Sequence, residues 1–458
     1  MAVISVVKLT ELEGAKRIDA EFYQPDYLKF NENLLKVSHV TLGKLCEKIH
    51  RNPMCYGFEY VASGIPFFRI DDLYNPFIEI SNVVFISEDT HQKFFSTALK
   101  SGDILMGVRG NTIGRLGVYK GENYHANISP NLIFFRLFNP EIANYIATVL
   151  LSKVGQKQIK RILAGTGQPT ITSDLIRGIK IPIIEDIISI VHAFVADAFM
   201  EFEKARSLYA QAENILLEEL GLKDFKPKYE LFYTANLSKA FGVHRVDADY
   251  FHPVYERIIH YLKTKFKLER LSHLAIKLEI KINPDYQQIY KYIEISDIRT
   301  DIGEVTYTER LGSELPPNAR IPINGGELLT SKVRPTRKAI AIVPSDLKNN
   351  VICSSAFTVF DVPSPLREYI FISLRSIIGL LQLEQPTTGT EYPTIRDDDV
   401  KNILVPVLPK ETQQKIASLV QQSHEARKKA KELLEEAKRK VEEAIETEIK
   451  NSGDSNKK

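Results

Sequence analysis

The sequence predicts an α+β protein with two tandem mixed α/β domains, each followed by a long helix, and the two helices are expected to form an antiparallel coiled coil. Three observations lead to this fold class: the length, an internal repeat and two heptad patterns. The chain has 458 residues, more than a single hydrophobic core usually organises. We expect a first domain with its N-terminal arm, a first helical region, a linker with the second domain, a second helical region and a disordered tail. These segments are 1–182, 183–223, 224–406, 407–450 and 451–458.

An internal repeat sets this domain plan. RIDAEFYQPDY at 17–27 resembles RVDADYFHPVY at 245–255, and GTGQPTI at 165–171 resembles GTEYPTI at 389–395. Both GT-x-x-PTI motifs are followed by a short apolar strand with a central proline. Because two matched pairs occur in the same order at nearly the same spacing, the chain is predicted to be a tandem duplication with a unit of about 225 residues.

Each repeat ends in a predicted helix with a coiled-coil seam. Apolar residues there alternate steps of three and four, as the a and d positions require. The first series is Val191, Val195, Ala198, Phe202, Ala205, Tyr209, Ala212 and Leu216. The second is Val420, Ala430, Leu434, Ala437, Val441 and Ala444, interrupted by Arg427. Since a seam needs a partner, we expect an antiparallel pair about 50 Å long; the alternative is that each helix lies flat on its own domain.

Composition and spacing argue against several classes of protein. No apolar run reaches the about 18 residues of a membrane span, and the apolar N-terminal run is too short for a secretory signal. A cytoplasmic protein is therefore expected. Three cysteines without a CxxC pair and ten histidines without HExxH spacing predict neither a disulfide framework nor a metal site. No cofactor is expected. The net charge of +2 says nothing of nucleic acid by itself, because local clusters matter more.

The sequence also offers no motif for catalysis. An adenine methyltransferase tetrapeptide, Asn or Asp followed by Pro-Pro and an aromatic residue, is absent. The glycines of GVRGNTIGRLG at 107–117 have neither dinucleotide-binding nor P-loop spacing. Asp19 and Asp247 each lie two residues after an arginine in a segment rich in aromatics, which favours packing at a domain entrance over acid catalysis. A non-catalytic protein is expected.

Candidate DNA contacts occur where basic, amide and aromatic side chains share a segment. Arginine can bind guanine with two hydrogen bonds, asparagine and glutamine suit adenine, and lysine suits phosphate. The candidates in the first repeat are Arg109, Asn111, Thr112 and Arg115 in the glycine-rich turn, and Lys153, Lys157, Lys160 and Arg161 at helical spacing. Those in the second repeat are Lys332, Arg334, Arg337 and Lys338. Gln168 and Tyr392 occupy variable positions of the GT-x-x-PTI motifs.

Each of these groups also has a structural interpretation. The glycine-rich segment can be a hairpin turn, although its glycines would also allow close approach to phosphate. The cluster at 332–338 can be a solvated loop, and the cluster at 153–161 a solvated helix face. The frame of the GT-x-x-PTI motifs favours a structural role, locking the junction between domain and helix.

The two repeated segments, at 17–27 and 245–255 and in the GT-x-x-PTI motifs, together resemble those of the specificity (S) subunit of type I restriction-modification systems. The resemblance covers nearly the whole chain and rests on the GT-x-x-PTI segment before a helix and on the arginine-acid-aromatic-proline segment of 17–27 and 245–255. It implies two target-recognition domains that each read half of a bipartite asymmetric DNA sequence, spaced by the helix pair. It implies double-stranded DNA, two methyltransferase (M) subunits and restriction/translocase (R) subunits as partners, and no chemistry in this chain.

Two other functions stay open from the sequence. One is a coiled-coil adaptor that scaffolds partner subunits and does not bind DNA, and the other is an enzyme with an unrecognised active site. Because recognition domains of this family vary greatly, base-reading residues cannot be transferred by motif, and the target sequence is not predicted.

Overall fold

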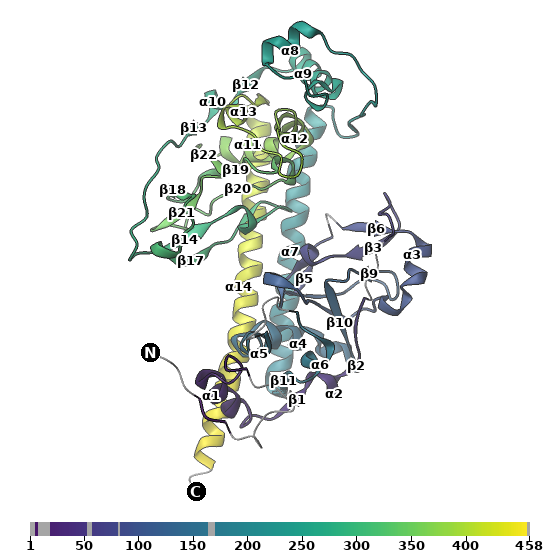
Figure 1. Cartoon of the computed structure of the whole chain (residues 1–458), viewed down its shortest axis with the longest axis vertical. Coiled ribbons are helices and arrows are strands. Elements are labelled where there is room, and N and C mark those ends of the chain that lie inside the picture. Colours follow the sequence, from purple (N-terminus) through teal and green to yellow (C-terminus); the bar gives the residue numbers. More distant parts are fainter. Residues whose placement is uncertain (1–4, 8–18, 53–56, 81–82, 164–169, 456–458) are drawn as a thin grey trace. The chain divides into compact units, whose positions relative to one another are not determined.

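The computed structural model describes residues 5–7, 19–52, 57–80, 83–163 and 170–455. The chain divides into two compact units, one of residues 1–201 with 428–458 and one of residues 202–427, called unit 1 and unit 2 below. Each unit combines a mixed domain with part of each long helix, α7 (Glu185–Glu219) and α14 (Lys410–Ser455), which are drawn in Figure 1.

Unit 1 is built on a four-stranded antiparallel sheet in the order β2-β10-β7-β8. Its strands are β2 (Cys46–Arg51), β10 (Leu132–Leu137), β7 (Ile104–Gly107) and β8 (Leu116–Val118). The continuous apolar run LIFFRL gives β10, and every residue of this strand is buried, as expected for a strand covered on both faces. The one charge, Arg136, donates to Asp103 through Nε at 3.0 Å and Nη2 at 2.7 Å, so the buried guanidinium is paired.

The rest of unit 1 packs around this sheet. Its smaller sheets are β6-β3-β9, β4-β5 and β1-β11. Their strands are β6 (Val84–Ile86), β3 (Ile65–Phe68), β9 (Asn127–Ile128), β4 (Leu73–Tyr74), β5 (Phe77–Ile78), β1 (His39–Thr41) and β11 (Lys180–Pro182). The shorter helices are α1 (Pro25–Leu34), α2 (Leu42–Leu45), α3 (Glu88–Lys93), α4 (Ala143–Leu151), α5 (Lys153–Leu163) and α6 (Ser173–Arg177).

Unit 2 repeats this plan with a sheet in the order β13-β22-β19-β20. These strands are β13 (Ile276–Lys277), β22 (Phe357–Asp361), β19 (Leu328–Ser331) and β20 (Ile340–Ile342). A second four-stranded sheet has the order β17 (Thr308–Leu311), β14 (Ile289–Ile293), β21 (Val351–Ser354) and β18 (Ala319–Ile323). Two pairs of strands complete the unit, β15 (Ile298–Arg299) with β16 (Glu304–Val305) and β12 (Leu268–Arg270) with β23 (Leu404–Pro406). Its shorter helices are α8 (Leu237–Val243), α9 (Pro253–Lys265), α10 (Leu271–Leu274), α11 (Leu366–Arg375), α12 (Ile377–Glu384) and α13 (Asp397–Lys401).

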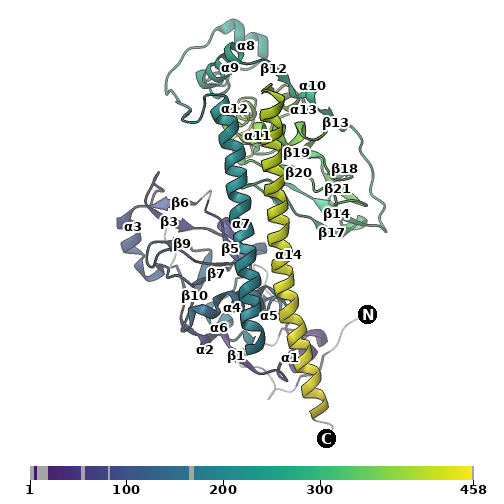
Figure 2. The same cartoon turned by 180° about the vertical axis from the view of Figure 1, so that it is seen from behind.

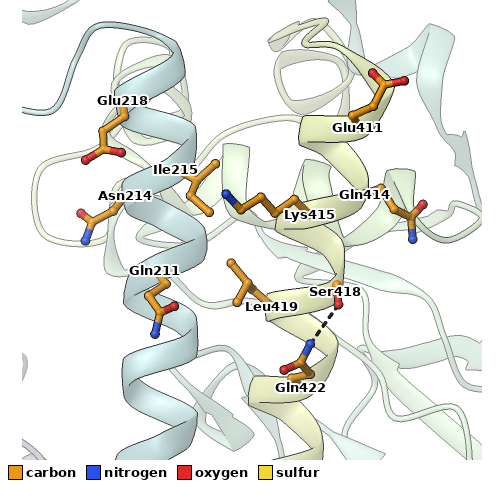
Figure 3. Close-up of a pocket in the computed structure, with 10 residues that line it drawn as sticks. All are labelled: Gln211, Asn214, Ile215, Glu218, Glu411, Gln414, Lys415, Ser418, Leu419 and Gln422. Carbon is orange, nitrogen blue, oxygen red and sulfur yellow. Dashed lines mark hydrogen bonds between the residues drawn. The ribbon is translucent and has the colours of Figure 1, made fainter.

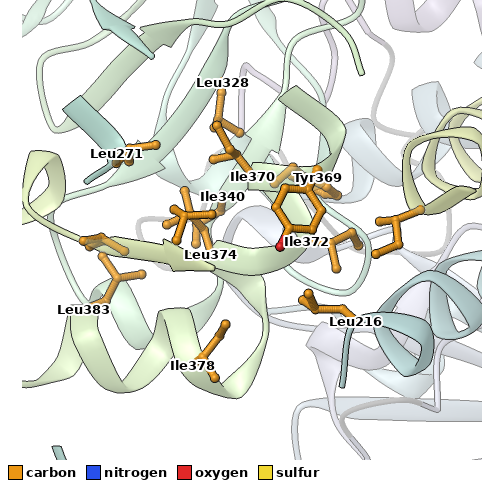
Figure 4. Close-up of a cluster of buried hydrophobic side chains, with 14 of the residues drawn as sticks. Leu216, Leu271, Leu328, Ile340, Tyr369, Ile370, Ile372, Leu374, Ile378 and Leu383 are labelled. Atoms are coloured by element: carbon orange, nitrogen blue, oxygen red, sulfur yellow. The ribbon is translucent and has the colours of Figure 1, made fainter. Parts of the chain in front are cut away.

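The largest apolar cluster of unit 2 joins the sheet to helices α11 and α12. Leu328 of β19 and Ile340 of β20 are buried with Leu374 of α11 and Ile378 of α12 (Figure 4). Leu216 of α7 belongs to the same cluster, so α7 is packed into the domain core.

Matching hydrogen bonds confirm the predicted duplication. The hydroxyl of Tyr145 donates to the carbonyl of Pro182 at 2.9 Å, and that of Tyr369, 224 positions later, donates to Pro406 at 2.6 Å. In each unit this bond fixes the strand that leads into a long helix. The two repeats therefore share the same local tertiary structure at this place.

The long helices pair antiparallel within each unit. In unit 2 the carbonyl of Ala205 accepts from the hydroxyl of Ser423 at 2.7 Å. Glu218, toward the end of α7, lines the same pocket as Glu411, at the start of α14 (Figure 3). Figure 2 shows the parts of α7 and α14 in this unit lying side by side. The predicted seam residues of α7 are all 7% exposed or less, so the predicted pairing is confirmed, and the helices do not lie flat on separate domains.

The seam of α14 differs from the prediction at Leu434 and Ala444. Leu434 and Ala444 are half-buried, while Ile445 is 2% exposed, so the burial shifts by one residue near the end of the helix. Arg427 is also buried, with its guanidinium paired to Asp301 and stacked 4.1 Å from the centre of the Phe202 ring. A charge is tolerated in the seam because unit 2 supplies its carboxylate.

The predicted disordered tail from residue 451 is wrong for residues 451–455, because α14 continues to Ser455. The hydroxyl of Ser452 donates to the carbonyl of Lys36 at 3.0 Å, a tertiary contact that the local sequence does not reveal. Over the described residues, no helix is both long and apolar enough to cross a bilayer.

Candidate nucleic-acid interface

The two units carry a repeated turn at the same place in their main sheets. The first turn, residues 109–115, connects β7 to β8 and contains a short 3₁₀ helix, η4 (Gly110–Thr112). The second turn, residues 333–339, connects β19 to β20 and contains η9 (Pro335–Arg337). Most of the candidate DNA contacts of the second repeat, and four of the nine of the first, lie on or beside these turns.

The GT-x-x-PTI motifs hold both turns by backbone bonds. Thr170 forms an antiparallel bridge with Arg109, and Thr394 forms the corresponding bridge with Val333. The next residue of each motif extends the contact, because Ile395 donates to the carbonyl of Lys332 at 2.9 Å and Ile171 donates likewise in unit 1. The described part of each motif therefore fastens a turn to its domain. Gln168 lies outside the described residues.

The backbone of the two turns is left-handed at matching positions. Gly110 and Gly114 have φ of 61° and 85°, and Arg334 and Lys338, each 224 positions later, have φ of 47° and 60°. Glycine adopts this conformation without a steric penalty, whereas a residue with a Cβ is strained by it. Strain of this kind concentrates at functional sites, which draws attention to the second turn.

Arg334, which is half-buried, packs against Tyr392 at the second turn. Its guanidinium stacks 4.3 Å from the centre of the Tyr392 ring, and Nη2 donates to the carbonyl of Glu391 at 3.1 Å. Tyr392 is 60% exposed, and Arg337 on the same turn is exposed as well. Stacking holds the arginine while its remaining donors stay available to a ligand.

The two lysines of the same cluster are used inside the unit. Lys332 pairs with Asp397 at 3.0 Å. Burial raises the pKa of Asp397, but the bonds from Thr358, Lys332 and Lys277 outweigh it and lower that pKa to about 2. Lys338 is half-buried, and burial lowers the pKa of its amino group. Lys332 is thus paired and Lys338 half-buried within unit 2, and their contacts with DNA stay predictions.

The first turn presents fewer exposed side chains than the second. Arg109, Thr112 and Arg115 are half-buried, and the hydroxyl of Thr112 donates to the carbonyl of Arg109 at 2.8 Å. The side chain of Asn111 lies outside what the structure describes. The structure thus brings Arg109 and Arg115 into one compact turn bound to Thr170.

The basic cluster on α5 is mostly engaged within unit 1. Lys153 pairs with Glu442 at 3.1 Å, and the ammonium of Lys157 lies 5.1 Å from the centre of the Phe30 ring. Arg161 is 6% exposed and stacks 4.2 Å from the Phe22 ring. Arg161 is therefore packed within unit 1, and its contact with DNA stays a prediction. Lys160 is exposed.

Sequence reasoning missed Arg375, which contacts the backbone of the second turn. Its guanidinium donates to the carbonyl of Lys338 at 2.7 Å. The signal was present, because Arg375 interrupts the apolar run YIFISLRSIIGLL at 369–381, and an arginine in such a run has to find buried acceptors. Among the described residues, no group of three His, Cys, Asp or Glu side chains is arranged to bind a metal ion.

Comparison with known proteins gives one curated relative. No protein-family model matches the chain. The chain is 28% identical over 129 residues to the type I restriction enzyme MjaVIII specificity subunit of Methanocaldococcus jannaschii. The match spans 27% of this chain and 30% of the length of that relative. This match confirms the resemblance to type I specificity subunits that the sequence predicts.

Two solved structures are similar to the chain over most of its length. The type I restriction-modification S subunit from M. genitalium is 12% identical, with a TM-score of 0.37 over 91% of this chain and 95% of that one. The HsdS subunit from Thermoanaerobacter tengcongensis is 14% identical, with a TM-score of 0.27 over 91% and 96%.

Proposed function

We propose that this chain is the DNA-binding specificity subunit of a type I restriction-modification complex and that it recognises a bipartite asymmetric DNA sequence. The observation that carries the proposal is the repeated turn, one in each unit, held by the same motif and bearing arginines. A duplicated reader with different side chains in its two copies suits a target with two different halves.

The second turn has the chemistry of a base reader. The Arg334 guanidinium lies over an exposed tyrosine ring, and a guanidinium can donate two parallel hydrogen bonds to O6 and N7 of guanine. Arg337 on the same turn adds an exposed cation, suited to guanine or phosphate. In the first turn, glycines at 110 and 114 allow the backbone to approach the duplex closely.

The partners follow from the duplication and the resemblance. Two similar units present two similar surfaces, so we propose two methyltransferase subunits for each specificity chain, with restriction subunits joining that complex in the cytoplasm. Cleavage, translocation and methyl transfer belong to those partners, and this chain directs them. Native mass spectrometry of the co-expressed complex is expected to give one specificity chain with two methyltransferase chains. A one-to-one complex at saturating methyltransferase would contradict this stoichiometry.

A second candidate, a scaffolding adaptor that does not bind DNA, is supported by one surface feature. Leu231 and Phe232 are both 91% exposed, and Phe241 of the nearby helix α8 is 69% exposed. Exposed apolar side chains gathered in one segment are typical of protein-binding surfaces. Such a surface is also compatible with a DNA reader that assembles with partners.

One selection experiment separates the two functions. The full chain, with its methyltransferase partner, is mixed with a library of randomised duplexes, and bound DNA is recovered and sequenced over several rounds. The proposal predicts two short enriched blocks at a fixed spacing. Recovery of duplexes without any enriched sequence would contradict sequence-specific recognition and favour the adaptor.

A further inference from the structure

Arg375, the last residue of α11, is fully buried and uses its whole guanidinium inside unit 2. It is 0% exposed. A guanidinium has five N–H donors, and five acceptors surround this one. They are the hydroxyl of Tyr209 at 2.8 Å and the carbonyls of Lys338 at 2.7 Å, Ile340 at 3.0 Å, Thr300 at 2.8 Å and Asp301 at 2.6 Å.

None of these five acceptors is a carboxylate, so every hydrogen bond of the guanidinium goes to a backbone carbonyl or to the Tyr209 hydroxyl. Burying a charge in this way is costly unless every donor is satisfied. The guanidinium also lies 5.3 Å from the Tyr209 ring and 5.2 Å from the Phe371 ring, which adds cation–π stabilisation. An apolar residue at this position would avoid the free-energy cost of desolvating a charge. The contribution of Arg375 therefore lies in the backbone segments that its hydrogen bonds hold.

What it fixes is the exit of the second turn. Lys338 has φ of 60°, a conformation that is strained for a residue with a Cβ. Arg375 binds the carbonyl of Lys338 and, two residues later, that of Ile340 at the start of β20. The other end of the turn is held separately, because Arg334 donates its backbone N–H to the carbonyl of Pro393 at 2.7 Å. The turn is therefore anchored on both sides of Arg337.

The first turn does not share this device. Leu151 stands where unit 2 has Arg375, 224 positions earlier, and Gly114 stands where unit 2 has Lys338. Gly114 needs no clamp against steric strain. Its carbonyl accepts from the side chain of Gln156 at 3.4 Å. The repeat thus contains a built-in comparison, a relaxed glycine turn in one copy and a clamped, strained turn in the other.

We propose that Arg375 is a positioning residue for DNA recognition, which clamps the second turn so that Arg334 and Arg337 face the second half of the target in one fixed geometry. Tyr209 ties this clamp to α7, since its hydroxyl is the acceptor for Nε of Arg375. The inference rests on the proposed function and adds a residue that does not itself touch DNA.

Tyr209→Phe is the mildest test, because it keeps the ring and removes one acceptor. Arg375→Lys is the stronger variant and loses the fork that spans two backbone segments. Tyr369→Phe is the matched control. It removes another buried tyrosine hydrogen bond in unit 2, to Pro406 at 2.6 Å, and this bond does not reach the turn. All three full-length variants are compared with the wild type in the duplex selection and in native-state trypsin digestion.

The clamp predicts a change confined to one half of the target. Tyr209→Phe and Arg375→Lys should lose about tenfold in discrimination at second-half bases and leave first-half discrimination unchanged. Trypsin should cut after Arg337 faster in both. Tyr369→Phe should lower the melting temperature and alter neither half of the target. If Arg375→Lys does not fold, Tyr209→Phe carries the test.

Other results overturn the inference. Unchanged second-half discrimination in Tyr209→Phe and in folded Arg375→Lys would do so, as would an equal loss in both halves. If the wild type selects no sequence at all, the proposed function has failed instead. Trypsin digestion then decides alone whether Arg375 clamps the turn.

Discussion

Gly110 and Arg334 occupy the same position of two repeated turns, 224 residues apart, and both have a left-handed backbone, with φ of 61° and 47°. The second copy therefore places a large charged side chain where the first has none. A Cβ on Gly110 would meet nothing within 4 Å, so the backbone angle is what favours glycine there. At Arg334 the same left-handed backbone accompanies a guanidinium stacked on Tyr392, and strain retained at a non-glycine residue points to a role for its side chain.

Gly110→Ala should lower the free energy of unfolding by about 1 kcal/mol, because alanine is strained at this positive φ. Gly178→Ala is the control, since Gly178 has φ of −81° and an added Cβ there would come no closer than 3.6 Å to the carbonyl of Leu175. Urea unfolding of both variants measures the difference. Equal midpoints would show that the strain is not real.

Arg334→Ala should weaken DNA binding. If Arg334 binds guanine, the loss should be about 1–3 kcal/mol and confined to one base of the second half. If it binds phosphate, all sequences should weaken alike and the salt dependence should fall. Titrations with single-base variants at two salt concentrations distinguish these outcomes. Arg257→Ala, which removes an arginine of α9 that pairs with Glu230, should leave affinity unchanged, and an equal loss there would indicate a nonspecific charge effect.

Ala205→Glu should destabilise the helix pair by about 3 kcal/mol or more, because it buries a carboxylate in a packed seam. Ala205 is 0% exposed, and its carbonyl accepts from Ser423. Ala210→Glu changes an exposed alanine of the same helix and should be nearly neutral. Thermal unfolding followed by circular dichroism tests this, and similar melting of the two variants would contradict the seam.

Asp397→Asn should lower stability at neutral pH. Since the folded pKa of Asp397 is about 2, below its usual 3.8, its ionised form contributes stability above about pH 4, and that contribution disappears as the pH falls through 2. The carboxylate is partly exposed, so about 1–2 kcal/mol is expected. Asp398→Asn, whose side chain is 72% exposed, is the control. A stability difference between wild type and Asp397→Asn that persists unchanged at pH 2 would contradict this assignment.

The fold could be predicted to a large extent because its signals are local or repeated. Apolar residues spaced three and four apart, as at Val191, Val195 and Ala198, predict a paired helix directly from helix geometry. The GT-x-x-PTI motifs mark equivalent places in the two units. The end of α14 could not be predicted, since Ser452 bonds to Lys36, a residue more than four hundred positions away.

The candidate site was predictable only in part. Clustering of charges identified the second turn, but it could not tell Lys332 and Lys338 from Arg334 and Arg337. That distinction depends on Asp397, which pairs with Lys332 from 65 positions away, and on burial against the domain. The stacking of Arg334 on Tyr392 likewise joins two segments that are distant in sequence.

The most direct test of bipartite recognition is to sequence the duplexes selected by Arg109→Ala and Arg334→Ala side by side with those selected by the wild type. Each arginine belongs to the turn of one unit. The account predicts that Arg109→Ala relaxes one enriched block, that Arg334→Ala relaxes the other, and that each leaves the remaining block intact. If either variant alters both blocks together, the two units do not read separate halves of the target.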